Sequence, residues 1–400
     1  MTSSRPSRRG LLGYAGAGGA GLLAGVGGAL ALSGQDEAVA TVSPTVPGRI
    51  SPYGLHQPGV TSRTPRANRL LALDLRRDVD AEALGRLMRQ WTGTIEAATQ
   101  GHAPPGDTIR DLAQDNVDLS VVVGWGPRLF RRLGLAAPGG LSPVPAFRHD
   151  KLLERWNGGD LLVMVGAADD TSVVHLVRRL MLDAEPFARP RWEQVGSWRG
   201  LDADQAPTTG RNLFGQVDGT GNLRPEDPLF DSTVWAKTPD WFAGGTTLVV
   251  RRIEMDLDVW ESLTRDEMER SVGRDLDTGA PLTGGSERDQ PDLSARDSGG
   301  RLIVPADSHV RRSHPSQNGG ARILRRGLNY TEFDAASGRS HAGLIFCSFQ
   351  ADIATQFVPL QQRLDEGDAL NEWTTAIGSA EFAILPGFER GGWLGERLLG

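Results

Sequence analysis

NRLLALDL, residues 68–75, has the alternation of a β-strand, and the segment 80–99 that follows carries apolar residues at helical spacing. A β-branched run at 119–124, LSVVVG, predicts the next strand. The run DLLVMV at 160–165 predicts a third strand, and residues 170–182 predict a second helix. This order is typical of an α+β fold, in which helices pack on one face of an antiparallel sheet.

The second half of the chain repeats this order of elements. We expect strands at 245–255 (GTTLVVRRIEM), 344–349 and 381–385, with helices at 259–274 and 355–364. The two series predict two ferredoxin-like halves, at 67–214 and 215–400, with antiparallel sheets and peripheral helices. No internal sequence repeat proves a duplication. Residues 275–300 are rich in Gly, Asp and Ser, which predicts a surface excursion.

The composition excludes several classes of protein. Of the 400 residues, 39% are hydrophobic, which is enough for a large buried core. The formal net charge of −7 gives no indication of a nucleic-acid-binding surface. Cys347 is the single cysteine, so neither an internal disulfide nor a cysteine-based zinc site can form. It lies in an apolar run, where a buried thiol that acts as a small hydrophobe is expected.

The first forty residues have the features of a targeting segment. Two arginines, Arg8 and Arg9, precede a stretch without charge at 10–35, and the AVA at 38–40 provides a small-residue cleavage site. These features together predict a twin-arginine signal over 1–40, followed by an extended lead-in at 41–66. A transmembrane anchor is the alternative, but the many glycines make this stretch a poor membrane helix. We expect an exported protein that is extracellular, in the cell envelope or periplasmic.

The export prediction bears on the interior of the protein. The twin-arginine route carries folded proteins, and it serves chains that take up a cofactor before export. An exported chain without disulfides is unusual for its compartment. A core that contains a cofactor would account for both features.

Three short motifs carry the chemistry. The segment NLFGQVDGTGN at 212–222 contains G-x-x-D-G, whose glycines let the backbone approach a flat ligand. Alone, it could equally be an Asp-Gly turn in a surface loop. The segment DSHVRRSHP at 307–315 precedes GARILRRG at 320–327, so Arg325 follows His309 by sixteen residues. A lone histidine is usually structural or exposed.

The three motifs in this order resemble the dye-decolourising peroxidase family. Members carry G-x-x-D-G, a segment like DSHVR with the proximal haem histidine, and a segment like ILRRG with a distal arginine. The similarity extends from about Asn68 to the C-terminus and includes 371–373 and 378–380. It implies a dimeric α+β barrel-like fold that binds one haem b per chain in its C-terminal half. The export signal is similar to that of the family's secreted twin-arginine branch.

The resemblance also implies a role for each motif residue. His309 would be the iron ligand, since neutral imidazole is the usual peroxidase ligand. Asp368 would accept a hydrogen bond from its second ring nitrogen and make the ligand more basic. Asp218 would act as base and then acid on peroxide, and Arg325 would stabilise the developing charge. Because an ordinary aspartate has a pKa of about 3.9, we expect best activity in acid.

The remaining candidates are less sharply defined. The family pattern places Gly219, Thr220 and His314 at the haem, and Arg311 is a candidate for pairing with a propionate. Pairing of Arg311 within the protein is equally consistent with the sequence. Aromatic residues such as Tyr330 and Trp373 could carry a radical to the surface, but the sequence does not rank them. The other histidines are expected to be exposed or structural: His56, His102, His149, His175 and His341.

The function implied is a haem peroxidase. It would reduce hydrogen peroxide and oxidise dyes, phenolics or other bulky aromatic reductants through an oxoferryl intermediate. Two alternatives remain: an exported deferrochelatase that releases iron from haem, and a non-catalytic haem-binding protein. A redox partner protein and the oligomeric state are left open by the sequence, and no nucleic-acid partner is expected.

Overall fold

The computed structural model of the chain describes residues 48–204, 206–335 and 338–400. The predicted signal at 1–40 and the beginning of the lead-in, through residue 47, lie outside this range. Within the described ranges, no helix combines the length and apolarity that a membrane crossing requires.

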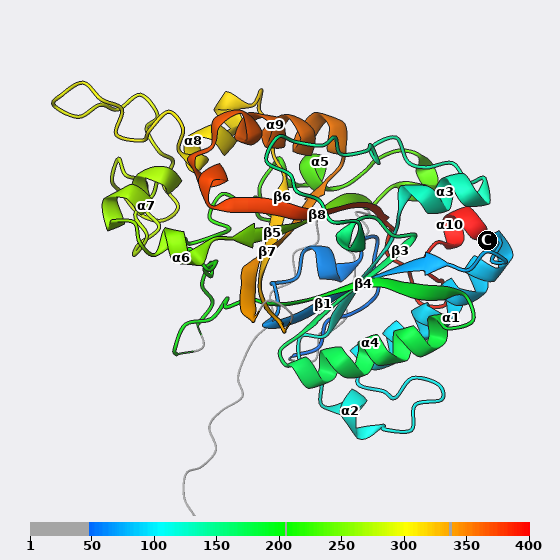
Figure 1. Ribbon diagram of the computed structural model, residues 1–400. Coiled ribbons are helices and arrows are strands. Elements are labelled where there is room, and N and C mark those ends of the chain that lie inside the picture. The colour runs from blue at the N-terminus through cyan, green and yellow to red at the C-terminus, as the bar shows by residue number, and fades with distance from the viewer. Residues whose placement is uncertain (1–47, 205, 336–337) are drawn as a thin grey trace, which may run out of the picture. The chain divides into compact units, whose positions relative to one another are not determined.

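Eight antiparallel strands close into one barrel in the order β1-β3-β2-β8-β5-β7-β6-β4 (Figure 1). Each half of the chain supplies four neighbouring strands in the same relative order, β4-β1-β3-β2 and β8-β5-β7-β6. This is the ferredoxin-like arrangement twice, so the predicted α+β barrel of two such halves is confirmed. The strands are β1 Ala67–Leu75, β2 Ser120–Trp125, β3 Leu161–Ala167, β4 Ala188–Ser197, β5 Thr246–Met255, β6 Leu324–Asp334, β7 Arg339–Gln350 and β8 Thr374–Ile384.

The helices cover the two halves unequally. The long helices α1 and α4 lie side by side on the N-terminal half, whereas short helices and loops, including α8 and α9, cover the C-terminal half (Figure 1). The helices are α1 Ala81–Thr99, α2 Asp111–Gln114, α3 Pro127–Leu133, α4 Asp170–Ala184, α5 Phe230–Val234, α6 Leu257–Trp260, α7 Arg265–Val272, α8 His309–Ser313, α9 Val358–Gly367 and α10 Glu396–Leu399.

Helix α1 shows how the sequence specifies the N-terminal half. Its N-cap, Asp80, accepts a hydrogen bond from the backbone N–H of Ala83, which satisfies one of the free donors of the first turn. Leu84, Leu87 and Trp91 face the sheet and are fully buried, as their spacing predicts. Burying each of these side chains stabilises the fold by about 2 to 3 kcal/mol.

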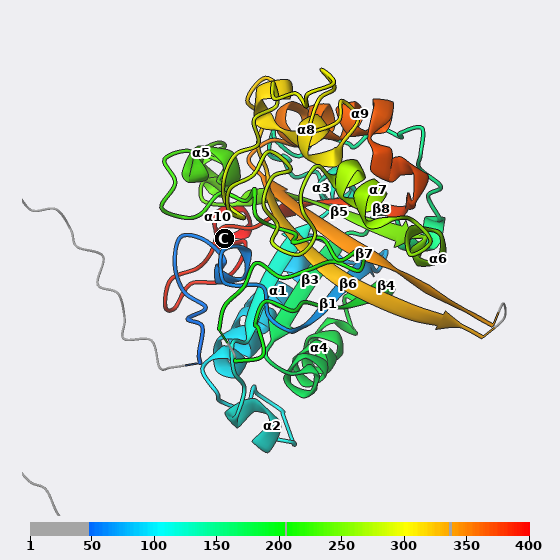
Figure 2. The same cartoon turned by 90° about the vertical axis from the view of Figure 1, so that its left-hand side faces the viewer.

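The barrel is thinly joined where its two halves meet. Strands β2 and β8 are paired over two residues each, and β4 pairs with β6 only at Ser197 and Asn329. The first residues of β6, 324–328, therefore have β7 on one side and no strand on the other. Figure 2 shows that β6 and β7 also run on together beyond the barrel. The open edge of β6 is the part of the fold that positions the site.

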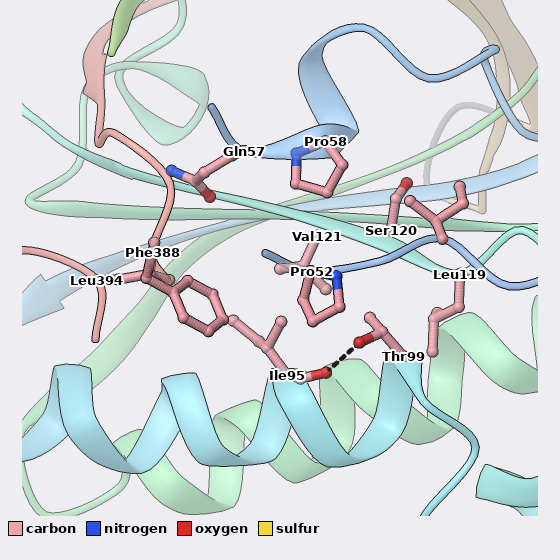
Figure 3. Close-up of a pocket in the computed structure, with 11 residues that line it drawn as sticks. Pro52, Gln57, Pro58, Ile95, Thr99, Leu119, Ser120, Val121, Phe388 and Leu394 are labelled. Atoms are coloured by element: carbon pink, nitrogen blue, oxygen red, sulfur yellow. Dashed lines mark hydrogen bonds between the residues drawn. The ribbon is translucent and has the colours of Figure 1, made fainter. Parts of the chain in front are cut away.

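The lead-in beyond residue 47 packs against the barrel and is part of its core. The Gln57 amide binds the backbone of Val123 and the carbonyl oxygen of Leu385, which ties the lead-in to β2 and to the end of the chain. Figure 3 shows the small gap that remains between this segment, α1 and Phe388. Its volume of about 10 Å³ is too small for a ligand larger than water.

Several predicted elements differ in extent from the observed ones. Strand β4 is missing from the prediction because its outward side chains are charged, and the arginine-rich start hides β6. The single helix expected at 259–274 is two helices, since Thr264 and Glu267 form a capping box that begins α7 anew. Strands β7 and β8 each begin before the apolar run that predicted them.

Candidate active site

His309 is the first residue of α8 and is held by a carboxylate from the end of α9. Its Nδ1 lies 2.5 Å from Oδ2 of Asp368. Asp368 is also the N-cap of the next turn, where its Oδ1 accepts a hydrogen bond from the backbone N–H of Leu370. The Asp368 side chain is 4% exposed and that of His309 is 26% exposed. The imidazole is therefore anchored by one nitrogen and accessible at its other edge.

The electrostatic surroundings of His309 connect it to the other motif residues. Burial by itself disfavours the charged imidazole, but the nearby Asp368 carboxylate outweighs burial, so the pKa of His309 is raised. The charges of Arg325 and Asp218 also act on this pKa, in opposite directions. The three motifs therefore meet at one place in the fold, as the sequence predicts.

Asp218, in the 212–222 loop, forms an ion pair with Arg325, the second residue of β6. Nη1 of Arg325 lies 3.3 Å from Oδ1 of Asp218. Asn212 donates to Oδ2 of the same carboxylate at 3.3 Å. Asn222 binds both the backbone N–H and the carbonyl oxygen of Arg325, at 3.0 and 2.8 Å, in place of a neighbouring strand. The Asp218 side chain and the Arg325 backbone are thus each held by an amide from the 212–222 loop.

A cavity of about 200 Å³ opens to solvent beside this ion pair. Gly219 lines it with φ of 123°, a conformation that requires glycine. Gly327 leaves room in front of Asp218, since a Cβ there would lie 3.5 Å from the carboxylate Oδ2. The lining residues are Thr64, Trp198, Thr209, Asp218, Gly219, Asn222, Leu223, Arg224, Arg288, Arg325, Arg326 and Gly327.

The donor set fits a haem iron held from one side. An axial histidine binds iron through one ring nitrogen while the other donates to a carboxylate, and His309 has this arrangement with Asp368. Nε2 of His309 makes no hydrogen bond within the described part of the chain, so it is free for a metal ion. A carboxylate and a guanidinium, in Asp218 and Arg325, are available to a small ligand of that ion.

Two residues that were predicted to contact the haem, Arg311 and His314, bind other groups of the protein. Arg311 donates to the backbone carbonyl oxygens of Leu293, Val304 and Pro305, which favours pairing within the protein over pairing with a propionate. His314 accepts from the backbone of Ser316, and its Nε2 lies 3.2 Å from Gln290.

Thr220 points to a carboxylate next to the cavity. Its hydroxyl donates to Glu287 at 3.0 Å, and Thr209 donates to the same oxygen at 2.5 Å. Contacts of Thr220, Arg311 and His314 with a haem stay predictions.

Three of the remaining histidines have structural partners. His175 Nε2 lies 2.9 Å from Oδ2 of Asp107 in the N-terminal half. His56 stacks on Trp235 with ring centroids 3.7 Å apart, and His341 lies 2.5 Å from Glu254. These contacts agree with the expectation that they are structural.

Sequence reasoning missed the residues that hold the motif side chains. Asn212 and Asn222 begin and end the quoted 212–222 segment, so their positions on either side of the aspartate were a usable signal. Arg326 and Trp198 could not be found in this way. Arg326 lies next to Arg325 in a strand, which predicts that it points to the opposite face, yet both residues line one cavity.

Comparison with known families agrees with this geometry. Residues 57–197 match the model of the Dyp-type peroxidase N-terminal domain, and residues 209–389 match that of the Dyp-type peroxidase C-terminal domain. Together the two matches span most of the described chain and include all three motifs.

Individual relatives are similar over nearly their whole length. A dye-decolorizing peroxidase of Thermobifida fusca is 38% identical, over 86% of this chain and 83% of its own. A deferrochelatase of Shigella sonnei is 32% identical, over 94% and 96%. The oxyferrous complex of DtpA from Streptomyces lividans superposes with a TM-score of 0.85 at 38% identity, over 88% of this chain and 98% of that one. The chain therefore belongs to the Dyp-type peroxidase family and is a haem-dependent enzyme of the peroxidase class.

Proposed function

We propose that this peroxidase binds haem b through His309 and oxidises dyes, phenolics and similar aromatic reductants at the expense of hydrogen peroxide. The observation that supports the proposal most strongly is the arrangement of four side chains. An imidazole anchored by Asp368 and an Asp218–Arg325 ion pair act on one another electrostatically across one site. A protein that merely stores haem needs the first pair but not the second, so the non-catalytic alternative has no such support.

Haem, held by His309, would supply an iron that hydrogen peroxide can oxidise by two electrons. Asp218 would hold a proton at its carboxylate between two steps: it removes one from the inner peroxide oxygen and returns it to the outer one. Asn212 and Arg325 fix the orientation of this carboxylate. The outer oxygen would then leave as water.

Arg325 would act as a fixed positive charge. Because Asn222 holds the Arg325 backbone and Asp218 pairs with its guanidinium, this charge is preorganised and would need little movement as negative charge builds up on the leaving oxygen. Asp368 would keep His309 in the tautomer that presents Nε2, and would make that nitrogen more basic.

Absorption spectroscopy tests this proposal. The purified protein should show a Soret band that shifts within milliseconds to seconds of adding peroxide, and the shift should reverse when a phenol is added. Asp218→Ala should retain the Soret band and slow the shift. An unchanged rate in that variant would mean that a group other than Asp218 transfers the proton. A purified protein without a Soret band would contradict the assignment of haem.

A second candidate is release of iron from haem, because relatives named deferrochelatase match 94% of this chain. In that case haem would be the substrate as well as the cofactor. Incubation with free haem under reducing conditions, followed by fluorescence of iron-free porphyrin, separates the two activities. Porphyrin fluorescence that grows with time would support deferrochelation, whereas intact haem would support peroxidase activity alone.

We also propose that residues 1–40 direct export by the twin-arginine route. The supporting feature is the Arg8–Arg9 pair before an uncharged stretch and the AVA site. Replacing both arginines by lysine should leave the protein in the cytoplasm with its haem. Export of that variant would contradict the proposal.

A further inference from the structure

Arg326 is a buried cation without a counter-ion in the part of the chain that the structure describes. The residue is 5% exposed. No hydrogen bond or ion pair joins its guanidinium to another described residue, in contrast to Arg325, which pairs with Asp218. Buried charges are normally paired, because an uncompensated one is strongly destabilising. A guanidinium that is unpaired among the described residues is suited to a partner that binds from solution.

The charge state of Arg326 and its surroundings supports this interpretation. Burial lowers the pKa of Arg326 to about 10, which still leaves the guanidinium charged at neutral pH. The residue opposite Arg326 on the neighbouring strand β7 is Cys347, and burial raises the pKa of that thiol to about 12. The thiol is therefore neutral at neutral pH and cannot balance the charge of Arg326.

Arg326 lines the same cavity as Asp218 and Arg325, and the cavity is rich in positive charge. Arg224 and Arg288, which are both exposed, also line it. Among the lining residues Asp218 is the single carboxylate, and it is already paired with Arg325. The nearby Glu287 accepts hydrogen bonds from two threonines. A small anion that enters this cavity would gain from the charge of every lining arginine.

One wall of the cavity is aromatic. Trp198 is 7% exposed, and a Cβ at Gly327 would lie 3.4 Å from its Cζ3 and 3.5 Å from Oδ2 of Asp218. Glycine at this position therefore keeps a gap open between the indole and the carboxylate. A cavity of about 200 Å³ with a flat wall and a buried cation suits a single small ring that carries an acid group.

We propose that this cavity binds a small aromatic carboxylate, with its acid group on the Arg326 guanidinium and its ring against Trp198, beside the Asp218–Arg325 pair. Arginine matches a carboxylate in geometry as well as in charge. The carboxylate could also be a propionate of the porphyrin. The opening to solvent and the two exposed arginines of the lining, Arg224 and Arg288, favour an acid that arrives from outside.

Such an acid would be a reducing substrate if it also carries a phenol, and this step rests on the proposed peroxidase function. Each phenolic acid would give up one electron and its phenolic proton and become a phenoxyl radical. Two of them would reduce one hydrogen peroxide to two waters, so electrons and protons balance. The binding step itself needs no peroxide.

Calorimetric titration with benzoate tests binding separately from turnover, since benzoate has no phenol. The haem-loaded protein should bind benzoate in a saturable way and should bind neutral benzamide at least tenfold more weakly, as expected for a hydrogen-bonded charge. Arg326→Met should lose benzoate affinity to a similar extent, while Arg301→Met, at an exposed arginine outside the cavity lining, should keep it. Equal affinity of Arg326→Met and the parent protein, or no binding by the parent, would overturn the proposal.

Two further measurements on Arg326→Met separate the remaining explanations. Without benzoate, its melting temperature should equal or exceed that of the parent protein, because an unpaired buried charge has been removed. A clearly lower melting temperature would mean that Arg326 has a structural partner. Its haem content should be unchanged, and a lowered haem content would assign the guanidinium to a propionate instead of a free acid. Because no measurement here uses peroxide, failure of the peroxidase function would leave these results interpretable.

Discussion

Each half of the barrel holds one histidine hydrogen-bonded to an aspartate, and the two pairs differ in their surroundings. In the N-terminal half, His175 and Asp107 are both buried, with side chains 7% and 3% exposed. In the C-terminal half, the buried Asp368 holds a His309 that is 26% exposed. The charges of Arg325 and Asp218 act on His309, whereas the charged group next to Asp107 is Arg179.

The difference follows from how each half covers the same sheet. Helices α1 and α4 bury an unbroken apolar face, so the histidine there joins a loop to a helix and has a structural role. Short helices and loops cover the C-terminal half and leave polar side chains around a cavity. A histidine–aspartate pair is therefore not a site in itself. The groups that face it decide what it does.

The largest expected effect comes from removing the imidazole at the cavity. His309→Ala should abolish stable haem binding, because the iron loses its protein ligand. The measurement is the ratio of Soret to protein absorbance after purification. His175→Ala should bind haem as the parent does. Equal haem content in His309→Ala and the parent would contradict the assignment of the two pairs.

The next effect concerns stability, and here the variant at His175 should be the more strongly affected of the two. His175→Ala leaves the Asp107 carboxylate buried without its ring partner, which should lower the free energy of unfolding by about 3 kcal/mol. Denaturant unfolding measures this change. The haem-free form of His309→Ala also leaves a buried carboxylate, Asp368, without its ring partner, but it should lose less stability because removing a partly exposed ring opens that carboxylate to water. Similar losses in both variants would mean that the two pairs have the same role.

Removing the Arg325 charge should affect the rate of the peroxide reaction and not the haem content. Arg325→Ala should keep its haem and react with peroxide about a hundredfold more slowly, as expected for the loss of about 3 kcal/mol of charge stabilisation. Stopped-flow absorbance at the Soret band measures the rate. A variant at Arg179, the arginine near the other pair, should react at the parent rate. A parent-like rate in Arg325→Ala would contradict the proposed role of Arg325 in charge stabilisation.

Asp368→Asn sharpens the comparison at the ligand itself. Asparagine can still accept from Nδ1 of His309 but carries no charge, so the ligand becomes less basic. We expect haem to remain bound and the peroxide reaction to slow by about ten- to a hundredfold. Resonance Raman spectroscopy of the ferrous protein should show a weaker iron–histidine bond. An unchanged iron–histidine frequency would show that Asp368 does not act on the ligand.

The smallest expected effect is the acid response of the N-terminal pair. Burial would raise the pKa of Asp107, but hydrogen bonds from Ile109 and His175, with the charges of His175 and Arg179, lower it on balance. A lowered folded pKa adds stability that is complete above the unfolded value of about 3.9 and is lost as the pH falls through the folded value. Asp107→Asn should therefore show a flatter fall in unfolding free energy below about pH 5. An unchanged slope would contradict this.

Much of the fold could be predicted because the N-terminal half obeys simple patterns. The buried run of β3 and the spacing of Leu84, Leu87 and Trp91 fixed both the type and the place of their elements. Strand β4 escaped prediction because its exposed face is charged, and β6 because two arginines follow its first residue. In both strands, pairing across the barrel outweighs local preference.

Only the motif residues of the site could be predicted from the sequence. Asp218, His309 and Arg325 follow from the family pattern, and the structure brings them together. The Asn222 amide that holds the Arg325 backbone depends on the open edge of β6, a feature of strand pairing that the sequence pattern does not contain. The difference between the two histidine–aspartate pairs was hidden for the same reason, since neither partner is near in sequence.

The most direct test is an anomalous-scattering map of the haem-loaded crystal at the iron edge. The account predicts one iron peak bonded to Nε2 of His309, with Asp218 and Arg325 on the opposite side. An iron peak bound to any other residue, or a His309 ring turned away from the iron, would contradict it.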